Sequence, residues 1–326
     1  MLRRSLILVS ALACACALAG QAFGSQLIDR NASQISLKVN RQGVALLNYK
    51  AHGSWHHVLA WGAINARVAP AGDTPSRPQV KLRLDYAGGW GKYRKVVWPS
   101  FKNACRPYDG PQLAWFVTAC KAPDGSYWAV QAWQTDLPDL GFVPWTTKQS
   151  AWHLDLAHWT GPLAKVEAYT DWIYGGRYHD LFGRLTYKGQ PVHGYHTTRY
   201  GAPLDGYGRL IYLDTLNSAY GSGWRRENSF VAHKRHGNFC YGFYRFNPMT
   251  GGYAHPPGYR GGLRPEGNGS KYRITVIGPG VTPDIAWLGN GLPNYDARNP
   301  ALVSLEQQMN ALNHTLAGDD QLCRQN

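Results

Sequence analysis

The chain has 326 residues, of which 44% are hydrophobic and 13% aromatic, and its formal net charge is +14. This length suits two domains or one large all-β unit, and it excludes a chain too small to bury its own core. A surface of this charge attracts polyanions through long-range electrostatic steering. A basic exported protein can also be merely soluble, so composition alone does not choose a function.

The first 24 residues have the pattern of a secretory signal peptide. MLRR is a short cationic segment, and the apolar run SLILVSALACACALA follows it. Small residues then allow cleavage after Ala19, Ala22 or Gly24. The run is shorter than the roughly 20 residues of a spanning helix, and the sequence contains no second one, so no integral membrane span is predicted. The sequence predicts export, either to the periplasm or to the extracellular space.

Four cysteines follow the predicted signal peptide, and an even number in an oxidising compartment indicates disulfides. Four cysteines allow three pairings. We favour Cys105 with Cys120, across the turn sequence RPYDGP. We then expect Cys240 to pair with Cys323 and to tie the C-terminal tail to the body. The spacings contain no CxxC, so no metal site is predicted.

Strand signals dominate the chain. Residues 36–50 carry apolar and β-branched runs on both sides of a turn at Gly43, which is the pattern of a hairpin. Residues 80–86 alternate polar and apolar side chains, so one face of this strand is expected to be buried. Gly, Pro, Asn and Asp separate the later strands, as in an all-β protein. These strands are expected at 92–98, 113–120, 126–133, 152–159, 165–174, 183–187, 208–215, 229–233, 239–246 and 271–278.

One helix is expected near the C-terminus. Asn299 is a suitable N-cap and Pro300 a suitable first helical residue, and Gly318 provides the stop. Between them, apolar residues recur every three or four positions. The stretch 135–151 contains Pro and Gly and no sustained period, which indicates a domain boundary. The sequence therefore predicts an all-β protein of two β-sandwich-like units, 25–150 and 151–326, with a C-terminal α-helix.

Residues 183–215 show a strand, then G-x-PV-x-G, then a T-x-x-G…D-x-x-G-R turn and a further strand. The stretch resembles the transthyretin-like or carboxypeptidase-regulatory type of β-sandwich module. The resemblance implies a sandwich in the second half of the chain, with a role in binding or stability rather than catalysis. The matching residues are Gly189, Pro191, Val192, Gly194, Thr198, Gly201, Asp205, Gly208 and Arg209.

Two basic segments with interleaved aromatic side chains, 80–106 and 224–246, are the candidate ligand-binding regions. Flat aromatic rings suit the apolar faces of sugars, and Lys or Arg suits acidic groups. Two alternatives stay open: the rings can belong to a sheet covered on both sides, and the charges can protect edge strands. The predicted ligand-binding residues are Trp90, Lys92, Arg94, Lys95, Trp98, Arg225, Arg226 and Arg235.

Asp155, Glu167 and Asp171 are the candidate catalytic carboxylates. Glu167 and Asp171 lie four residues apart on one strand, about 13 Å between Cα atoms, which is too far for the closer glycosidase geometry. A working pair would need a carboxylate from another strand, and the alternative is a solvated strand face. Close histidine pairs occur without HExxH spacing, so no metal is predicted. A Ser/His/Asp triad stays open because triads are built in space, but no GxSxG elbow supports it. No cofactor is predicted.

Three functions remain open from the sequence. The first is a secreted, non-catalytic binding protein for an acidic or cell-wall-associated polysaccharide. The second is a secreted glycan hydrolase or lyase, which a cleft with two carboxylates within about 10 Å would favour. The third is a structural envelope protein. The expected partner is an anionic or neutral polysaccharide, and export makes specific nucleic-acid binding a poor expectation. The oligomeric state stays open.

Overall fold

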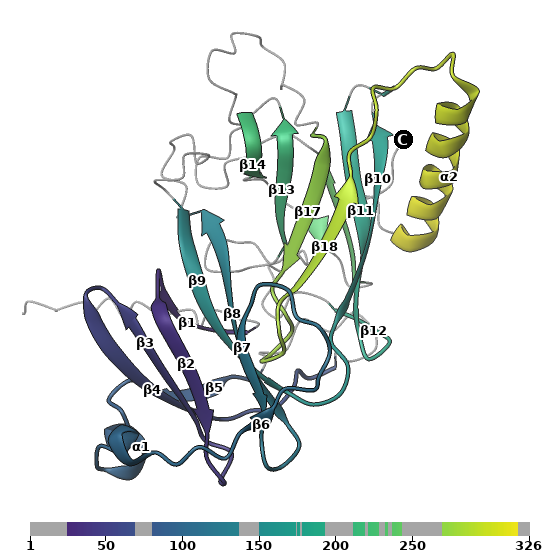
Figure 1. Ribbon diagram of the computed structural model, residues 1–326. Coiled ribbons are helices and arrows are strands. Elements are labelled where there is room, and N and C mark those ends of the chain that lie inside the picture. The colour runs from purple at the N-terminus through teal and green to yellow at the C-terminus, as the bar shows by residue number, and fades with distance from the viewer. Residues whose placement is uncertain are drawn as a thin grey trace, which may run out of the picture.

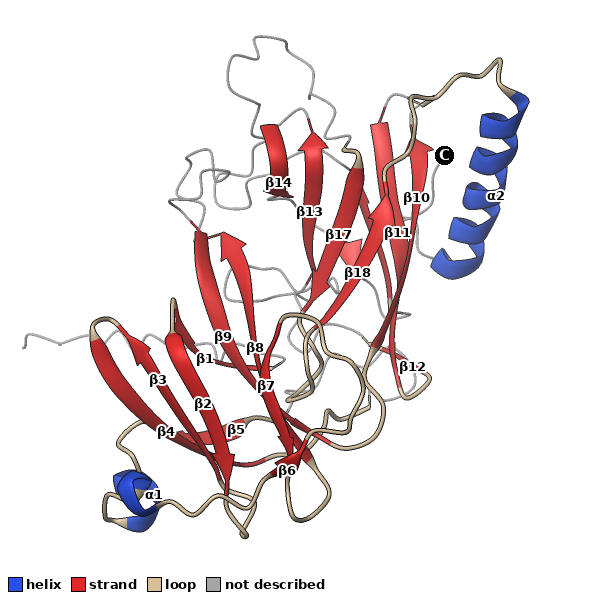
Figure 2. Ribbon diagram, in the orientation of Figure 1, coloured by secondary structure: helices blue, strands red, loops and turns tan. Residues whose placement is uncertain are grey.

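A computed structural model of the chain describes residues 25–68, 80–136, 150–173, 175–176, 178–192, 211–218, 221–227, 232–233, 237–242 and 269–318. The described strands form four antiparallel sheets, and one long helix lies near the C-terminus (Figure 1, Figure 2). The predicted all-β class with a C-terminal helix is confirmed. The sheets pack in two pairs, each with its own hydrophobic core.

The first pair of sheets contains the early strands. Facing side chains such as Tyr49, Val58, Trp128 and Leu156 form the core between them. One sheet has the order β1 (Gln26–Arg30), β9 (Ser150–Trp159), β8 (Tyr127–Asp136), β7 (Phe116–Lys121) and β6 (Arg106–Pro107). The other has the order β2 (Ser33–Val39), β3 (Ala45–Ala51), β4 (Ser54–Gly62) and β5 (Leu82–Asp85).

The second pair contains the later strands, and its core includes Leu181, Leu213, Phe239 and Ile274. One sheet has the order β10 (Lys165–Ile173), β11 (Tyr178–Tyr187), β16 (Asn238–Gly242) and β15 (Ala232–His233), with β12 (Gln190–Pro191) paired to β11. The other has the order β14 (Gly221–Glu227), β13 (Ile211–Ser218), β17 (Lys271–Val276) and β18 (Ile285–Asn290). The sheet that contains β7, β8 and β9 lies in the middle of the molecule (Figure 1).

Helix α2 (Pro300–Ala317) begins and ends where the sequence predicts. The Asn299 Oδ1 atom accepts a hydrogen bond from the Ala301 N–H at 3.0 Å, and the Gly318 N–H donates to the His314 carbonyl at 3.1 Å. The helix lies beside β10 and β11 (Figure 1). Among the helices of the described ranges, none has the length and apolar character needed to cross a membrane.

The strand expected at 92–98 is wrong. In its place are the short helix α1 (Trp90–Tyr93) and a 3₁₀ turn, Trp98–Ser100. Gly88 and Gly89 have φ angles of 62° and 119°, which turn the chain sharply. Pro99 lacks an N–H for a strand ladder. These two glycines and the proline therefore determine the structure of the stretch, despite its apolar pattern.

The predicted division after residue 150 does not coincide with the change from one sheet pair to the other. β9 follows that position, yet it pairs with β8 along its whole length, from Asp136 opposite Ser150 to Tyr127 opposite Trp159. β9 therefore belongs to the first pair of sheets. The chain passes into the second pair at 160–164, between β9 and β10. A domain boundary at residue 150 stays a prediction.

The predicted bond between Cys105 and Cys120 is confirmed, with Cα atoms 5.6 Å apart. Cys240 is also disulfide-bonded, and its predicted partner Cys323 lies outside the described residues. The resemblance at 183–215 stays a prediction, because 193–210 also lie outside them.

Candidate ligand-binding face

The outer face of the sheet β2–β5 carries the predicted aromatic and basic side chains of the first segment. Leu47 and Val58 point into the core between the first two sheets, so the residues that alternate with them point outward. Direct cross-strand pairs place Asn48 beside His57 and Lys50 beside Trp55. Trp61 likewise lies opposite Arg83 on β5. We call this surface, together with the segment 86–102 that packs on it, the outer face.

The segment 86–102 is held on this face by Asp85. One carboxylate oxygen accepts the Ala87 N–H at 2.9 Å, and the other accepts the Lys92 N–H at 3.0 Å. A Cβ atom on Gly89 would lie 2.6 Å from Val97 Cγ2 and 2.8 Å from the Lys95 carbonyl oxygen. Glycine is therefore required where the segment folds back on itself.

Trp98 and His57 form the centre of the outer face. Their rings are stacked, with centroids 3.7 Å apart and planes 6° from parallel. His57 Nδ1 lies 2.8 Å from Asn48 Oδ1, so this nitrogen carries the proton and donates. Asn48 in turn donates to Ser36 Oγ at 3.3 Å. Burial, with a smaller contribution from the neighbouring His56, lowers the pKa of His57 below its ordinary value, so the imidazole is neutral at pH 7.

A second aromatic contact joins the helix α1 to β4. The Lys92 ammonium group lies 4.3 Å from the centroid of the Trp61 ring and 5.3 Å from that of Tyr93. Around these contacts, rings face solvent: Trp90 is 57% exposed, Trp55 53% and Trp98 39%. Arg94 and Lys95 are exposed between Trp90 and Trp98. Five of the predicted ligand-binding residues therefore belong to the segment that packs on the sheet β2–β5.

The charge of this region is strongly one-sided. Residues 30–68 and 80–102 contain eleven Lys or Arg and a single acidic residue, Asp85. Asp85 is buried beneath the segment that it holds. Because its carboxylate already accepts backbone N–H groups, it offers an arriving ligand little repulsion. The outer face is an aromatic surface with a positive field.

The structure does not bring the second basic segment to the outer face. Arg225 and Arg226 lie on β14, opposite Thr215 and Asp214 of β13, in the second pair of sheets. β14 and α1 lie at opposite ends of the molecule (Figure 1). Arg235 lies outside the described residues. Of the two candidate regions, only the first therefore contributes to the outer face, and ligand binding by the second stays a prediction.

The three candidate carboxylates are also kept apart. Glu167 is exposed and accepts a hydrogen bond from Arg184 Nη2 at 2.9 Å, across the β10–β11 pair. Asp155 on β9 and Asp171 on β10 are buried, so the alternative of a solvated strand face is wrong for both. Burial, together with the charge of Glu306, raises the pKa of Asp171 to about 7.

Sequence reasoning missed several members of the outer face. Trp55, His57 and Trp61 belong to SWHHVLAWG, whose period of two places alternate residues on one side of a strand. This period of two could have identified these residues from the sequence alone. By contrast, the electrostatic interaction of Asp155 with Asp284, the residue just before β18, joins residues distant in sequence, and no local pattern predicts it.

In the described part of the chain, no three His, Cys, Asp or Glu side chains are grouped so as to hold a metal ion. No protein-family model matches this chain, and neither curated proteins nor solved structures give a match.

Proposed function

We propose that the protein is an exported, non-catalytic binding protein for an acidic polysaccharide, and that the ligand lies along the outer face. The observation that carries this proposal is the meeting of exposed Trp90 and Trp98 with Lys92, Arg94 and Lys95 on one surface. The exposed rings offer flat apolar surfaces to the CH faces of sugar rings. The cations between them pair with carboxylate, sulfate or phosphate groups along the polymer.

The construction of the face also supports binding. Trp98 is stacked on His57, and Lys92 is held over Trp61, so these groups are partly ordered before a ligand arrives. Ordering a free side chain on binding costs about 0.5–1.5 kcal/mol, and this cost is reduced for a group already held in place. The one-sided charge of residues 30–68 and 80–102 adds attraction at long range.

Export is part of the proposal. The N-terminal signal sequence supports it, and so does the Cys105–Cys120 disulfide, because such bonds form and persist in oxidising compartments. Outside the cytoplasm, the abundant polyanions include acidic polysaccharides and cell-wall polymers.

Binding is favoured over catalysis by the state of the candidate carboxylates. A general acid or nucleophile must touch the scissile glycosidic bond. Asp155 and Asp171 are buried, so a polymer does not reach them in this conformation. Glu167 is exposed but is engaged by Arg184, and it lies in the second pair of sheets, away from the outer face.

Two triple variants test the proposal. In the first, Lys92, Arg94 and Lys95 are each changed to Gln. In the matched control, the exposed Lys165, Lys188 and Lys271 of the second pair of sheets are changed to Gln. Both variants lose the same charge. Binding to polygalacturonate, with dextran as the neutral polymer, is measured at low and high salt, and released reducing ends are measured in the same wells.

We expect polygalacturonate binding that weakens steeply with salt, falls at least tenfold in the first variant and stays within about twofold in the control. Equal loss in both variants would mean that net charge alone retains the polymer, and would overturn the outer face as the site. Released ends or new double bonds would establish the hydrolase or lyase alternative. If neither binding nor product is detected, the structural envelope role becomes the favoured alternative.

A further inference from the structure

A buried carboxylate, Asp284, joins three segments of the chain. Its Oδ1 atom accepts hydrogen bonds from Ser25 Oγ and the Gly278 N–H, each at 2.7 Å, and its Oδ2 atom accepts one from Trp133 Nε1 at 2.8 Å. Gln131 bonds both backbone groups of Asp284, at 2.8 and 2.9 Å. The carboxylate therefore lies where β8 of the first pair of sheets meets the start of β18 of the second.

A second buried carboxylate, Asp155, lies within electrostatic reach of the first. Asp155 lies opposite Gln131 in the β8–β9 ladder and opposite Leu27 in the β1–β9 ladder. It is 4% exposed, and its Oδ2 atom has no hydrogen-bond partner among the described residues. Two carboxylates in an interior of low dielectric require a counter-cation or a proton.

Among the described residues, the groups around this pair supply little positive charge. Arg30 on β1 is the cation that acts on Asp155. His153 lies on the same strand as Asp155, with its ring centroid 5.0 Å from that of Trp133. Burial, followed by the charge of Asp284, raises the pKa of Asp155 well above its ordinary value, and burial raises that of Asp284 to about 6. With the Ser25 nitrogen in a peptide bond, Arg30 is the cation that the described residues provide for the pair.

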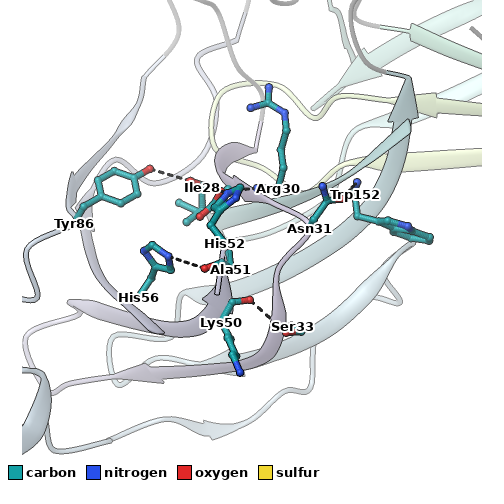
Figure 3. A network of polar contacts seen from close by, with 11 residues as sticks. Ile28, Arg30, Asn31, Ser33, Lys50, Ala51, His52, His56, Tyr86 and Trp152 are labelled. Atoms are coloured by element: carbon teal, nitrogen blue, oxygen red, sulfur yellow. Dashed lines mark hydrogen bonds and ion pairs between the residues drawn. The ribbon is translucent and has the colours of Figure 1, made fainter. Parts of the chain in front are cut away.

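Ser25 holds its own backbone nitrogen close to this pair. The residue is 2% exposed. Three covalent bonds separate its nitrogen from its hydroxyl oxygen, so the nitrogen lies within about 6 Å of Asp284 Oδ1. β1 fixes this position, because Tyr86 donates to the Ile28 carbonyl and Asn31 exchanges hydrogen bonds with the backbone of Trp152 (Figure 3).

The residues before Ser25 fit a processing site. Ala22 and Gly24 are small residues at the third and first positions before the Gly24–Ser25 bond, as export endopeptidases require. Ala17 and Ala19 fit the same rule for the bond after Ala19, so the sequence alone leaves the choice open. The position of Ser25 against two carboxylates is what distinguishes the bond after Gly24.

We propose that an export endopeptidase cleaves the Gly24–Ser25 bond, and that the freed α-ammonium of Ser25 becomes the buried counter-cation of Asp284 and Asp155. One water molecule is consumed as the Gly24 carbonyl carbon parts from the Ser25 nitrogen. Gly24 leaves with a carboxylate, and the Ser25 nitrogen takes up a proton. A neutral peptide nitrogen thus becomes a cation inside the junction of the two sheet pairs, and removal of the signal peptide completes the fold.

The pH dependence of stability distinguishes the two forms. In the uncleaved chain both carboxyls have raised pKa values, so stability falls as the pH rises above about 4, and for Asp284 this fall continues to about pH 6. A nearby ammonium favours both carboxylates, lowers their pKa values and removes that fall. Its own pKa rises, so its contribution is lost as the pH rises beyond about 8. The cleaved form is therefore the more stable between about pH 5 and 8.

The first measurement is the intact mass and N-terminal sequence of the exported protein. We expect a chain that begins at Ser25. A chain that begins at Gly20 or Phe23 would overturn the proposal. This result is independent of polysaccharide binding, so it fails or succeeds separately from the proposed function.

The second measurement compares two purified chains that begin at Ser25 and at Gly24. The added Gly24 keeps the Ser25 hydroxyl but moves the ammonium by about 3.5 Å. At pH 7 we expect the Ser25 chain to have a Tm higher by about 5 °C, and the difference to vanish at pH 4. We also expect an amine-acetylating reagent to label its α-amino group at least tenfold more slowly.

The Asp284→Asn substitution in both chains completes the comparison, since Asn keeps the shape of the side chain without its charge. It should remove most of the difference in Tm between the Ser25 and Gly24 chains. Equal Tm values and equal labelling of the two parent chains at pH 7 would overturn the proposal. If Asp284→Asn fails to fold, the labelling rates of the parent chains still decide the question.

Discussion

The Trp98 indole lies flat against the His57 imidazole, with ring centroids 3.7 Å apart and planes 6° from parallel. Trp98 belongs to the irregular segment 86–102, whereas His57 belongs to the regular strand β4. The stack therefore fixes an irregular segment to a regular sheet. It also leaves the opposite side of the indole facing outward, where Trp98 keeps 39% of its surface exposed.

Replacement of His57 by Ala should weaken polysaccharide binding about three- to tenfold. An aromatic pair contributes about 0.5–1.5 kcal/mol, and without it Trp98 must be ordered when the ligand binds. His56→Ala is the matched control: its ring stacks on buried Tyr49 on the other side of β4. Calorimetric titration with polygalacturonate should show weaker binding for His57→Ala alone. Equal affinities would remove His57 from the binding face.

Gly89→Ala should destabilise the protein by about 2–3 kcal/mol and weaken binding. The residue has a φ angle of 119°, and the new Cβ would meet Val97 and the Lys95 carbonyl. Gly161 is the control, because it has a φ angle of 75° with open space around it, so alanine there suffers only the backbone strain. Urea unfolding should place Gly89→Ala clearly below Gly161→Ala. The reverse order would contradict the packing of 86–102.

Local chemistry made much of the fold predictable. β-branched and aromatic runs between turn residues marked most strands, and Asn299, Pro300 and Gly318 marked α2 within a residue. The Cys105–Cys120 bond followed from a short turn between two strands. Each of these features depends on residues that are close in sequence, which is why the sequence alone revealed them.

The candidate site was only partly predictable. Trp90, Lys92 and Trp98 were found by composition, but their stretch was expected to be a strand. Its helical turns depend on the Asp85 carboxylate and on two glycines. A prediction from the pattern of apolar residues takes neither into account. The two basic segments were both chosen for their similar composition, and composition does not tell how far apart two segments lie in the folded protein.

Gln131→Ala should cost about 2–5 kcal/mol of stability. The side chain is buried. Its Nε2 atom donates hydrogen bonds to the Ala114 carbonyl at 2.7 Å and to the Asp284 carbonyl, and its Oε1 atom accepts one from the Asp284 N–H. Each buried group left unpaired costs about 1–3 kcal/mol. Gln308→Ala, on the exposed side of α2, should change stability by less than about 0.5 kcal/mol. Similar unfolding midpoints for the two variants would show that the junction does not depend on Gln131.

Replacing both Cys105 and Cys120 by Ser should lower the free energy of unfolding by about 3 kcal/mol. The bond closes a loop across a sequence separation of 15, and the estimate is the chain entropy that such a loop restores to the unfolded state. Denaturant unfolding without reductant compares the double variant with the parent, in which the disulfide of Cys240 stays intact. An unchanged midpoint would show that the loop is constrained by its strands alone.

Asp171→Asn should change how stability depends on pH. Burial and, to a smaller extent, the charge of Glu306 raise the folded-state pKa of Asp171 to about 7, against an ordinary value of 3.8. A raised carboxyl pKa means that the folded state binds the proton more tightly, so stability is greatest at low pH and falls as the pH rises from about 4 to about 7. The slope for one proton is at most about 1.4 kcal/mol per pH unit.

The asparagine keeps the shape of the side chain and carries no charge, so Asp171→Asn should remove this fall and be relatively more stable at pH 7 than at pH 4. Glu167→Gln, at an exposed position of the same strand, is the control and should leave the slope unchanged, because surface ion pairs such as Glu167–Arg184 contribute about 0–1 kcal/mol. Urea unfolding at pH 4, 5, 6 and 7 measures both. Parallel pH profiles for Asp171→Asn and the parent protein would mean that Asp171 is ionised in the folded state at neutral pH.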